Sequence, residues 1–575
     1  MPERTPSRFG WNRGYWPNTA LVAGEQHVIV GGQNVWNRGS GRMVSSKGFG
    51  ASVANSGGVN PLMNVGNTYG GVVGGGEIVQ AFGDGIYFFA GTTGNTAYVQ
   101  GVSRGVVLAN SITIWTGAIA VKAGVRQPGA PIIDVNTASA KGSSHNKGVY
   151  SVALTAIRDL TGGESTISPP SNVVTTNYHD IRITALGTMP SAASSVGIYV
   201  TKRGFGEFGP YFHLYDEELA TLQAGLPYII QVEDDPLTGW IDGQVGGLAP
   251  LDFTPPPPCN HCFVINAVVV AAGCYGGAGL SPSYPNNPDA YPVRFVLFVP
   301  GGGSITAVKG SGIEGAVLVC TGTSVNLVTA SQSDIQPLNI RPIWPTTGVV
   351  SANQIATVGR EIFAWVGTRG PVRDDIASEG DPGDEATAFA EPVMKFFEQN
   401  GYNASNCVVV YDPASDSVFY VNGTVGVGYC RYLRQWHTFF TFPAAIVTAV
   451  TDTLNGRALF SDAGGNLYEL ETGTGTTWSL ISQMQGGDFA SFIRTIVGAR
   501  ALVSASCRLD LYSNLDIVTP NAFGTNLAAG PNHGVFHHLN APDVKSFGWG
   551  LSGTDAGGTE LWAVESLDVT HPVRI

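Results

Sequence analysis

Charged residues are scarce in this chain of 575 residues, because Asp, Glu, Lys and Arg together make up only 13 % of it. The charges are also unbalanced: 43 acidic residues face 30 Lys and Arg, which leaves a formal net charge of −13. No basic cluster is longer than an isolated pair such as Lys202-Arg203. A protein that grips phosphates needs positive surface, so ordinary nucleic-acid binding is disfavoured. The possibility remains that nucleic acid slides past an acidic surface of this protein without being bound.

Long hydrophobic segments are also missing. The longest apolar run, residues 263–274, contains Asn266 and is too short to cross a bilayer. The polar residues 1–8 lead into no apolar stretch of the kind that marks a secretory signal. We therefore expect a protein that is made in a cytosol and does not insert into a membrane.

Cysteine is rare and odd in number, with seven residues between Cys259 and Cys507. Most lie in strand-like segments such as residues 316–320. An odd count without a secretory signal does not fit a disulfide framework. We expect seven reduced thiols, buried as small apolar side chains.

Glycine, by contrast, is abundant, and its 77 residues have no three-residue period, which excludes collagen. A hydrophobic content of 43 % excludes a disordered chain and a coiled coil. Short apolar segments alternate with Gly, Thr and Asn turns, as in residues 83–91 and 96–99, a pattern typical of hairpins. The only long helix we expect spans residues 390–400, with Pro392 in its first turn.

The chain divides into three segments. Residues 1–144 and 251–575 consist of short strands and Gly-rich turns, whereas residues 145–250 alternate more regularly. The tetraproline at residues 255–258 is a stiff spacer where the middle segment ends. We predict an all-β fold: an irregular β-propeller of about six to eight blades, or a large sandwich assembly, interrupted by a β-sandwich.

One turn sequence occurs twice. Asp462-Ala463-Gly464-Gly465 recurs at residues 555–558, each time between two strand-like segments. The aspartate suits capping of backbone amides, and the glycines suit positive φ. A spacing of 93 residues is too long for one blade, so the repeat is weak evidence for a propeller.

Three motifs are candidates for metal sites. Cys259-Asn260-His261-Cys262 is the first half of many zinc sites, but no second pair follows at finger or ribbon spacing. His533, His537 and His538 lie in a Gly/Asn-rich loop, and no carboxylate stands where a metalloprotease places its base. The acidic loop at residues 374–385 could bind calcium, yet it lacks an EF-hand frame. For the cysteine motif we favour a linker that runs into a buried strand. For the histidines we favour a place at the surface, and for residues 374–385 a loop that is either mobile or tied to a neighbour.

No catalytic constellation is recognisable. The sequence has no Gly-x-Ser-x-Gly elbow, no Walker lysine and no dinucleotide fingerprint after a strand. A glycosidase needs a carboxylate pair, which sequence alone does not place. We therefore expect no enzyme, no catalytic residue, no cofactor and no resident metal.

One similarity rests on residues 150–155, 163–165, 169–171, 198–201 and 211–214 of the middle segment. These stretches resemble the fibronectin-type-III-like sandwich inserted in many phage structural proteins. A second similarity rests on residues 259–270, 280–285, 287–292, 305–308, 316–327, 348–351, 359–364 and 429–440. Their order resembles the tail nozzle family of short-tailed phages, also called tail tubular protein B or phage stabilisation protein.

The resemblance implies a structural virion protein, assembled in the host cytoplasm, that forms a homohexameric ring at the tail tip. It implies a channel through which viral DNA passes without specific binding, a tail adaptor above, and fibres or spikes beside or below. An acidic lumen would let DNA slide.

Two other classes remain. One is a receptor-binding or glycan-binding propeller, with Trp11, Trp16, Trp36 and Trp436 as surface candidates, although buried tryptophan is commoner. The other is a glycan-cleaving propeller.

Overall fold

The computed structural model describes most of the chain. The described residues are 4–9, 29–38, 43–50, 53–54, 62–65, 68–73, 77–82, 85–90, 94–100, 103–108, 111–115, 120–138, 147–159, 162–177, 179–201, 206–230, 248–266, 268–285, 287–313, 315–331, 337–367, 369–378, 380–452, 456–463, 466–474, 476–482, 485–486, 492–503, 507–513, 525–527, 537–544, 546–555 and 560–572.

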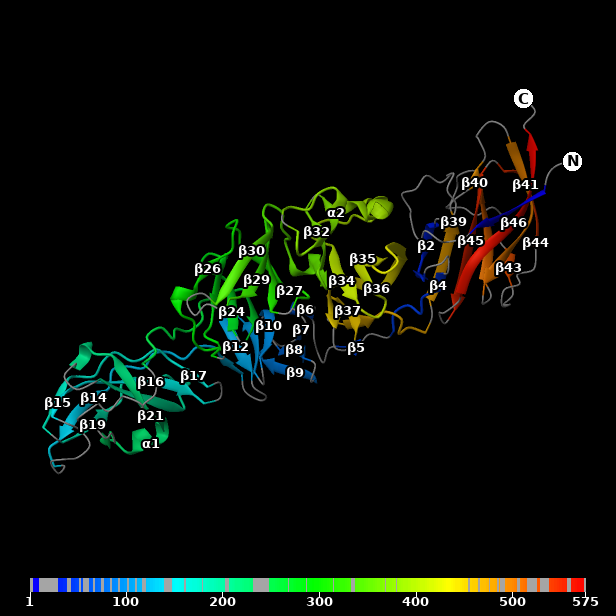
Figure 1. Ribbon diagram of the computed structural model, residues 1–575. Coiled ribbons are helices and arrows are strands. Elements are labelled where there is room, and N and C mark those ends of the chain that lie inside the picture. The colour runs from blue at the N-terminus through cyan, green and yellow to red at the C-terminus, as the bar shows by residue number, and fades with distance from the viewer. Residues whose placement is uncertain are drawn as a thin grey trace.

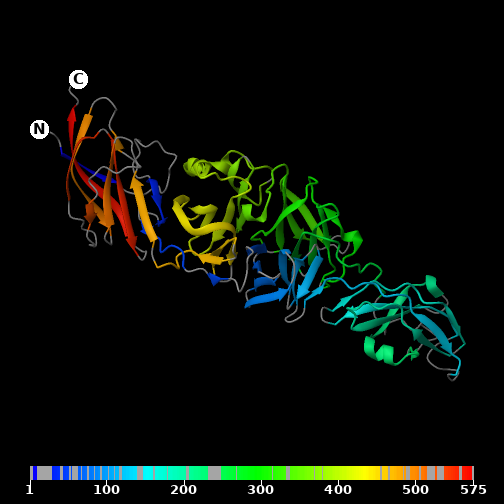
Figure 2. The same cartoon turned by 180° about the vertical axis from the view of Figure 1, so that it is seen from behind.

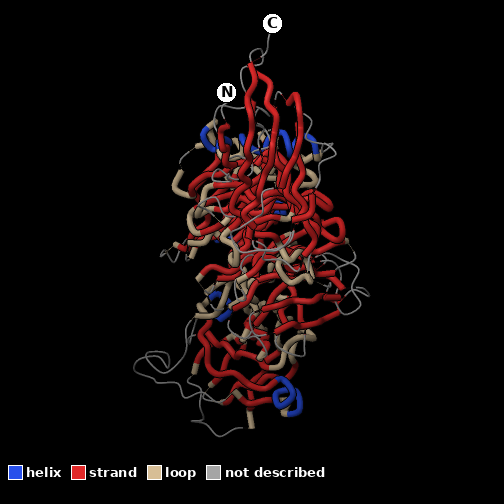
Figure 3. The backbone as a smooth tube through the Cα atoms, turned by 90° about the vertical axis from the view of Figure 1, so that its right-hand side faces the viewer, coloured by secondary structure: helices blue, strands red, loops and turns tan. Residues whose placement is uncertain are grey.

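Three modules follow one another along an elongated molecule (Figure 1). A sandwich, the arm, lies at one end, the propeller lies in the centre, and a pair of terminal sheets lies at the other end beside both chain termini. The view from behind shows the same order (Figure 2). Strands dominate all three modules, and the few helices are short (Figure 3).

The propeller is built from small antiparallel sheets. Blade 1 has β6 (Leu62–Val65), β7 (Thr68–Val73), β8 (Glu77–Phe82) and β9 (Gly85–Ala90). Blade 2 has β10 (Gly94–Gln100), β11 (Ser103–Leu108), β12 (Ser111–Trp115) and β13 (Ala120–Lys122). Blade 3 has β23 (His261–Ile265), β24 (Val268–Cys274), β25 (Gly279–Pro282) and β26 (Leu297–Phe298). Blade 4 has β27 (Ile305–Gly310), β28 (Ala316–Thr321), β29 (Val325–Ala330) and β30 (Leu338–Trp344).

The last blades are less regular. Blade 5 has β31 (Ile355–Val358), β32 (Glu361–Val366) and β33 (Gly370–Asp375). β34 (Val408–Asp412) pairs with the start of β35 (Ser417–Cys430), and the end of β36 (Gln435–Asp452) pairs with β37 (Arg457–Asp462). β38 (Asn466–Glu469) follows, and β5 (Val53–Ala54) pairs with it from the other end of the module.

The inner strands form a closed ring. β6, β10, β23, β27, β31, β34 and β36 contact one another in this order, and β36 contacts β6 again. Since β5 precedes β6 in the chain, its pairing with β38 closes the ring by joining the first and last parts of the module. The described residues therefore give seven sectors, within the predicted six to eight, and the all-β fold with propeller character is confirmed.

Blades 4 and 5 pack on both faces, which explains the apolar runs in their sequence. Leu318 and Cys320 of β28 point into the core shared with blade 5, whereas Val319 between them points into the core shared with blade 3. β32 alternates in the same way, with Ile362 facing blade 4 and Phe363 facing β34. A strand buried on both sides reads as a near-continuous hydrophobic run.

The predicted helical segment is a 3-10 turn, Glu391–Val393, followed by α3 (Met394–Gln399), with Pro392 in the first turn. A second short helix, α2 (Glu385–Ala388), precedes it. Further 3-10 turns span Val293–Phe295 and Ala352–Gln354. No helix in the described part of the chain is long and apolar enough to cross a membrane.

The arm comprises three small sheets around one core. Its strands are β14 (Ile132–Asn136), β15 (Gly148–Tyr150), β16 (Val152–Arg158), β17 (Gly163–Glu164), β18 (Val174–Thr176), β19 (Asp180–Ala185), β20 (Ser195–Thr201), β21 (Tyr211–Glu218) and β22 (Tyr228–Ile229), with a 3-10 turn at Gly206–Phe208 and α1 (Leu219–Ala224). Tyr150, Val152 and Leu154 share the core with β19 and β20, as their alternation predicts.

The chain enters and leaves the arm at one place. A Cβ on Gly124 would lie 2.5 Å from the Cβ of Pro255, so the two connecting segments run in direct contact. The backbone N–H of Thr166 donates to the carbonyl of Phe253, which ties the outgoing segment to the arm. This geometry is that of a module inserted into a propeller.

The terminal sheets combine both ends of the chain. Their N-terminal strands are β1 (Arg4–Phe9), β2 (Ile29–Gln33), β3 (Val35–Asn37) and β4 (Met43–Ser45). Their C-terminal strands are β39 (Thr476–Ser482), β40 (Gln485–Gly486), β41 (Phe492–Val503), β42 (Cys507–Ser513), β43 (Thr525–Leu527), β44 (His537–Val544), β45 (Ser546–Asp555) and β46 (Glu560–Pro572). β1 pairs with β46 and β2 with β39, while β2 also touches β36 and so joins these sheets to the propeller.

The assignment of the whole segment 1–144 to the propeller needs correction. β14 lies in the segment 1–144 assigned to the propeller, but it pairs with β19 of the arm. β1 to β4 were assigned to the propeller as well, yet they pair with strands of the terminal sheets and with one another. Both errors have one cause: the partners of these strands lie far along the chain, and the local sequence carries no signal of them.

Candidate functional site

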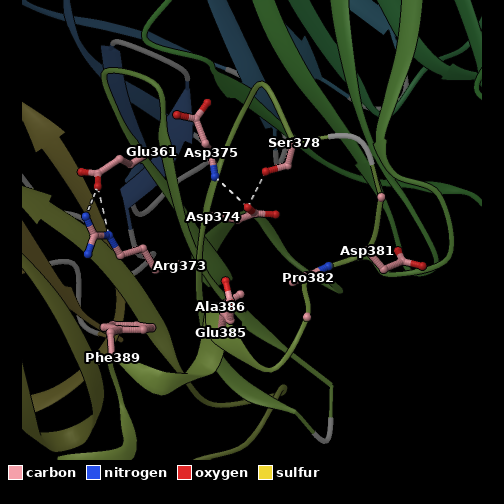
Figure 4. A pocket seen from close by; sticks show the side chains of 12 residues that line it. Glu361, Arg373, Asp374, Asp375, Ser378, Asp381, Pro382, Glu385, Ala386 and Phe389 are labelled. Atoms are coloured by element: carbon pink, nitrogen blue, oxygen red, sulfur yellow. Dashed lines mark hydrogen bonds and ion pairs between the residues drawn. The ribbon is translucent and has the colours of Figure 1, made fainter.

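A pocket of about 610 Å³ lies where the acidic loop follows β33 (Figure 4). Most of its polar lining is carboxylate. The residues around it are Glu361, Arg373, Asp374, Asp375, Ser378, Gly380, Asp381, Pro382, Gly383, Glu385, Ala386 and Phe389. This pocket gathers most of the loop predicted as a calcium candidate.

Glu361 is the centre of an ion-pair network at one side of the pocket. It opens β32, and Arg373 on the neighbouring β33 donates from Nε to its Oε1 at 2.9 Å. Arg431, in the turn after β35, donates from Nε to its Oε2 at 2.7 Å and also pairs with Asp416. The network joins blade 5 to the hairpin of β35 and β36.

This network controls the protonation of Glu361. Burial by itself would raise the pKa of this carboxyl, but the hydrogen bonds and charges of Arg373 and Arg431 outweigh it and hold the pKa below its ordinary value. Glu361 is therefore a charged partner for two arginines and does not suit the role of a proton donor.

The acidic loop is tied to its neighbours. Asp374 accepts hydrogen bonds from Nε1 of Trp344 at 2.7 Å and from Oγ of Ser378 at 2.6 Å. Asp381 accepts one from the backbone N–H of Thr346 at 2.9 Å. Of the two alternatives for residues 374–385, the tied loop is the one observed, and its donors from outside the loop are Trp344 at the end of β30 and Thr346 just after it.

The Cys259-Asn260-His261-Cys262 motif lies at the start of β23: its first two residues precede the strand, and its last two belong to it. Cys259 and Cys262 are buried in the core between blades 2 and 3. His261 contacts the carbonyl of Ile305 in blade 4 through Nε2, and burial lowers its pKa to about 4. Within the described ranges, no group of three His, Cys, Asp or Glu side chains is arranged to hold a metal ion.

The remaining candidates are placed as follows. His533, Trp11 and Trp16 lie outside the described residues, whereas His537 and His538 begin β44. Trp36 and Trp436 are fully buried, so they do not form a surface for a receptor. All seven cysteines are free thiols and buried.

The first copy of the repeated turn is capped as expected. Asp462 Oδ1 accepts the backbone N–H of Asn466 at 2.9 Å, and its Oδ2 accepts the hydroxyl of Tyr468 at 3.0 Å. In the second copy only Asp555 falls within the described residues.

A second pocket, of about 720 Å³, lies between the arm and blade 3. Tyr199 and Glu164 of the arm form one side, and the hydroxyl of Tyr199 donates to Glu164 Oε1 at 2.7 Å. Tyr284 and Arg294 of blade 3 form another side. Both bond to Asp252, which lies in the linker, the segment 248–258 that leads from the arm to blade 3. These bonds hold the linker between the two modules.

Sequence reasoning missed a buried ion pair beside this pocket. Arg158 at the end of β16 donates from Nη1 to Asp289 Oδ1 at 3.1 Å, and both side chains are almost inaccessible. The backbone N–H of Gly124 donates to the same oxygen at 2.5 Å. The one signal in the sequence was that Arg158 is a charged residue at the end of a strand, β16, that carries no other charge.

Lys309 was also missed. It lies in the inner strand β27, where burial lowers the pKa of its amine to about 7. Besides it, only two charged residues, Asp412 and Asp452, occur in the seven inner strands, in the parts of the chain that the structure describes. In the described part of the chain, the inner strands therefore give the axis of a single propeller little acidic charge.

Comparison with known proteins identifies no family for this chain. No family model matches the sequence, and no curated protein matches it. Three solved structures are similar at low TM-scores. The mitotic checkpoint complex has a TM-score of 0.28 at 8 % identity, covering 74 % of this chain and 91 % of that one. The WD40 β-propeller domain of Doa1 scores 0.23 at 7 %, covering 65 % and 90 %. Citrobacter koseri AztD scores 0.30 at 10 %, covering 70 % and 90 %. These similarities carry no argument about function.

Proposed function

We propose that this chain is a structural subunit of a short-tailed phage tail. Its copies form a ring-shaped nozzle at the tail tip, through which the genome leaves. The ring binds the tail adaptor on one side and serves as a platform for fibres or spikes. The protein belongs to the virion and is assembled in the host cytoplasm.

The observation that carries this proposal is the order of modules. A propeller interrupted by one sandwich is what the nozzle resemblance implies, and the arm projects from the propeller at the end opposite the termini (Figure 1). The buried pair of Arg158 and Asp289 fixes the arm to the blade region. A fixed, projecting arm is suited to contact a neighbouring subunit or a fibre.

The charge of the chain supports a conduit between subunits. Six copies would carry a formal charge of −78, six times −13, and no basic cluster is present in the sequence to hold a polyanion. A wall of the same sign as DNA repels it at close range, whereas a basic wall would bind it by counterion release. Because the inner strands of the propeller carry little charge, the conduit in this proposal is the space that the subunits enclose.

Electron cryo-microscopy of the purified full-length protein tests the proposal. A ring of six subunits with a central hole lined mainly by Asp, Glu and uncharged residues is expected. A protein that stays monomeric at high concentration, or a hole lined mainly by Lys and Arg, would contradict it. DNA retention in a gel at low salt gives a second reading, with no retention expected.

A glycan-binding or glycan-cleaving propeller is the second candidate, and the carboxylates around the 610 Å³ pocket favour it. Its test is hydrolysis or binding of bacterial surface polysaccharide by the full chain. Glu385→Gln, in the pocket, should abolish such an activity, while Glu398→Gln, outside the pocket, should keep it. No activity in the unchanged protein would remove this candidate.

A further inference from the structure

The second pocket, between the arm and blade 3, has a polar wall that the arm supplies. Thr155 of β16 pairs with Gly197 of β20, and Gly197 pairs with Asp216 of β21, so these positions share one face of the sheet. Glu164 of β17 reaches the same face, because its Oε1 accepts from Oγ1 of Thr155 at 2.6 Å and from the hydroxyl of Tyr199 at 2.7 Å. The other face of this sheet packs into the core of the arm. Both carboxylates therefore belong to an outer face, which the pocket leaves accessible.

Gly197 makes room for one of these carboxylates. A Cβ at this position would lie 2.5 Å from Oγ1 of Thr155 and 3.2 Å from Oε1 of Glu164. A larger side chain would therefore push the carboxylate of Glu164 away from β20. With glycine there, Glu164 lies over the strand whose neighbour β21 carries Asp216.

Each of the two carboxylates uses one oxygen and leaves the other open. Oε1 of Glu164 accepts the two bonds described above, and Oδ1 of Asp216 is bonded to Nε2 of His213 at 2.7 Å. In the part of the chain that the structure describes, Oε2 of Glu164 and Oδ2 of Asp216 have no hydrogen-bond partner. Burial, together with the charges of both carboxylates, raises the pKa of the Tyr199 hydroxyl, so both charges lie near the same ring.

The other walls of the pocket are apolar and aromatic. Leu248 and Leu251 of the linker line it, and they are 67 % and 76 % exposed. The one arginine of the lining, Arg294, lies 5.8 Å from the centre of the Tyr284 ring and is already paired with Asp252. The pocket therefore offers exposed aliphatic surface and a ring that already contacts a cation, but no arginine or lysine to compensate the two open carboxylates.

This combination selects the chemistry of a ligand. Ammonium groups form charge-assisted hydrogen bonds with carboxylates, and the faces of aromatic rings attract cations. Methylene groups gain free energy by covering exposed leucine side chains. An anion would be repelled, and a neutral sugar would leave both negative charges uncompensated.

We propose that the second pocket binds an aliphatic polyamine of the spermidine type. Its ammonium groups bind the open oxygens of Glu164 and Asp216, and its methylene groups lie against the two leucines of the linker. The pocket volume of about 720 Å³ suits such a ligand, since small-molecule sites span about 300 to 1,000 Å³. A ligand held in this way contacts both the arm and the linker, and so strengthens the connection of the arm to the propeller.

Isothermal titration calorimetry of the full-length protein with spermidine tests the proposal. Binding at one site per chain is expected, with weaker binding at higher salt and a higher melting temperature in the presence of spermidine. Putrescine and butane-1,4-diol form a matched pair of probes, because they have the same chain length and differ in charge. Putrescine should bind and the diol should not.

Variants separate the pocket from the acidic surface in general. Glu164→Gln and Asp216→Asn keep a hydrogen-bond acceptor but remove the charge, and each should weaken spermidine binding about tenfold or more. Glu207→Gln removes the same charge from an exposed turn of the arm outside the pocket and should leave the affinity unchanged. Leu251→Ser, at an exposed position, should weaken binding about threefold through the lost apolar contact.

Circular dichroism checks that each variant is folded. If Glu164→Gln unfolds, Asp216→Asn decides, because the side chain of Asp216 is half exposed and its loss is tolerated more easily. Unchanged affinity in Asp216→Asn, equal binding of the diol or of a neutral sugar, displacement of spermidine by equimolar Mg²⁺, or no binding at millimolar spermidine would each overturn the proposal.

Discussion

The propeller holds two modules by different buried contacts. The arm is fixed by a buried ion pair, Arg158 with Asp289. The buried hydrogen bonds of the terminal sheets are neutral: the backbone N–H of Val35 donates to Oγ1 of Thr438 at 2.8 Å, and that of Asn37 donates to Nδ1 of His437 at 3.0 Å. A charged acceptor, the carboxylate of Glu471, lies only in the part-buried rim, where Nε1 of Trp36 donates to it at 2.6 Å. We call the two sets of buried contacts the charged joint and the neutral joint.

The difference concerns what happens when one partner is lost. An ion left alone in a buried place is strongly unfavourable, whereas an unpaired neutral group costs less. The charged joint should therefore fail abruptly on a single substitution. The neutral joint spreads its stability over several bonds and should fail gradually, except where protonation changes the acceptor at His437.

Asp289→Ala should have the largest effect. It leaves Arg158 buried without its partner and should lower the free energy of unfolding of the arm joint by about 3 to 5 kcal/mol. Urea denaturation, with limited proteolysis of the linker between arm and propeller, measures it. Arg360→Ala is the matched control, because its pair with Asp375 is exposed, lies away from the arm, and should cost at most about 1 kcal/mol. Equal effects would refute the distinction.

Acid should weaken the neutral joint next. Burial, with the nearby charge of Arg38, lowers the pKa of His437 to about 3 from its ordinary 6.5. Since the folded state disfavours the proton, the stability is present above pH 6.5 and is lost as the pH falls from 6.5 towards 3. At pH 4.5 the loss should be about 2 to 3 kcal/mol.

Melting temperature against pH checks this prediction. His437→Gln should make the slope between pH 6.5 and 4 shallower, and the slope that remains should include the contribution of His261, whose pKa burial lowers to about 4. His213→Gln, on the half-exposed surface of the arm, leaves both buried histidines in place and should keep the slope of the unchanged protein. An unchanged slope in His437→Gln would show that other groups govern the acid response.

Gly163→Ala should disturb the charged joint more mildly. A Cβ at this position would lie 2.0 Å from Oδ2 of Asp289, so the carboxylate must shift away from Arg158. We expect a loss of about 2 kcal/mol in urea denaturation. Gly322→Ala is the control, since its Cβ would meet no atom within 4 Å and should change stability little. A larger loss at Gly322 would contradict the steric argument.

Thr438→Val should have the smallest effect. The substitution keeps the side-chain volume but removes an acceptor for the N–H of Val35 and a donor to its carbonyl. A loss of about 1 kcal/mol is expected because the other bonds of the neutral joint remain. Thr387→Val, on the exposed α2, is the control and should show no loss under the same denaturation. A loss above 3 kcal/mol at Thr438 would mean that the hydrogen bonds of the neutral joint do not contribute independently to stability.

Part of this architecture was predictable. Valine- and isoleucine-rich runs between Gly turns specify strands that are buried on two faces, and β28 and β32 follow this pattern. The arm was recognisable because Tyr150, Val152 and Leu154 alternate toward one core. The helix at residues 390–400 was recognisable from Val393, which stands three and four residues before Phe396 and Phe397, and from Pro392 at its start.

The candidate site was less accessible. The acidic loop was visible in the sequence, but its donors, Trp344 and Thr346, precede it by about 30 residues. Arg158 and Asp289 are 131 residues apart. Neither the sequence spacing nor the residue types of such pairs distinguish them from surface charges.

The sequence by itself determined the class of fold. Strands come from local β-branched and aromatic runs, and turns come from Gly and Asp, so a few neighbouring residues specify each of them. Only the tertiary structure decided which strands pair at long range. Arg4–Phe9 joins β46, Val53–Ala54 closes the ring on β38, and β14 belongs to the arm. The physical reason is that each of these choices depends on closing a long loop and burying a whole face at once, a balance that no local pattern records.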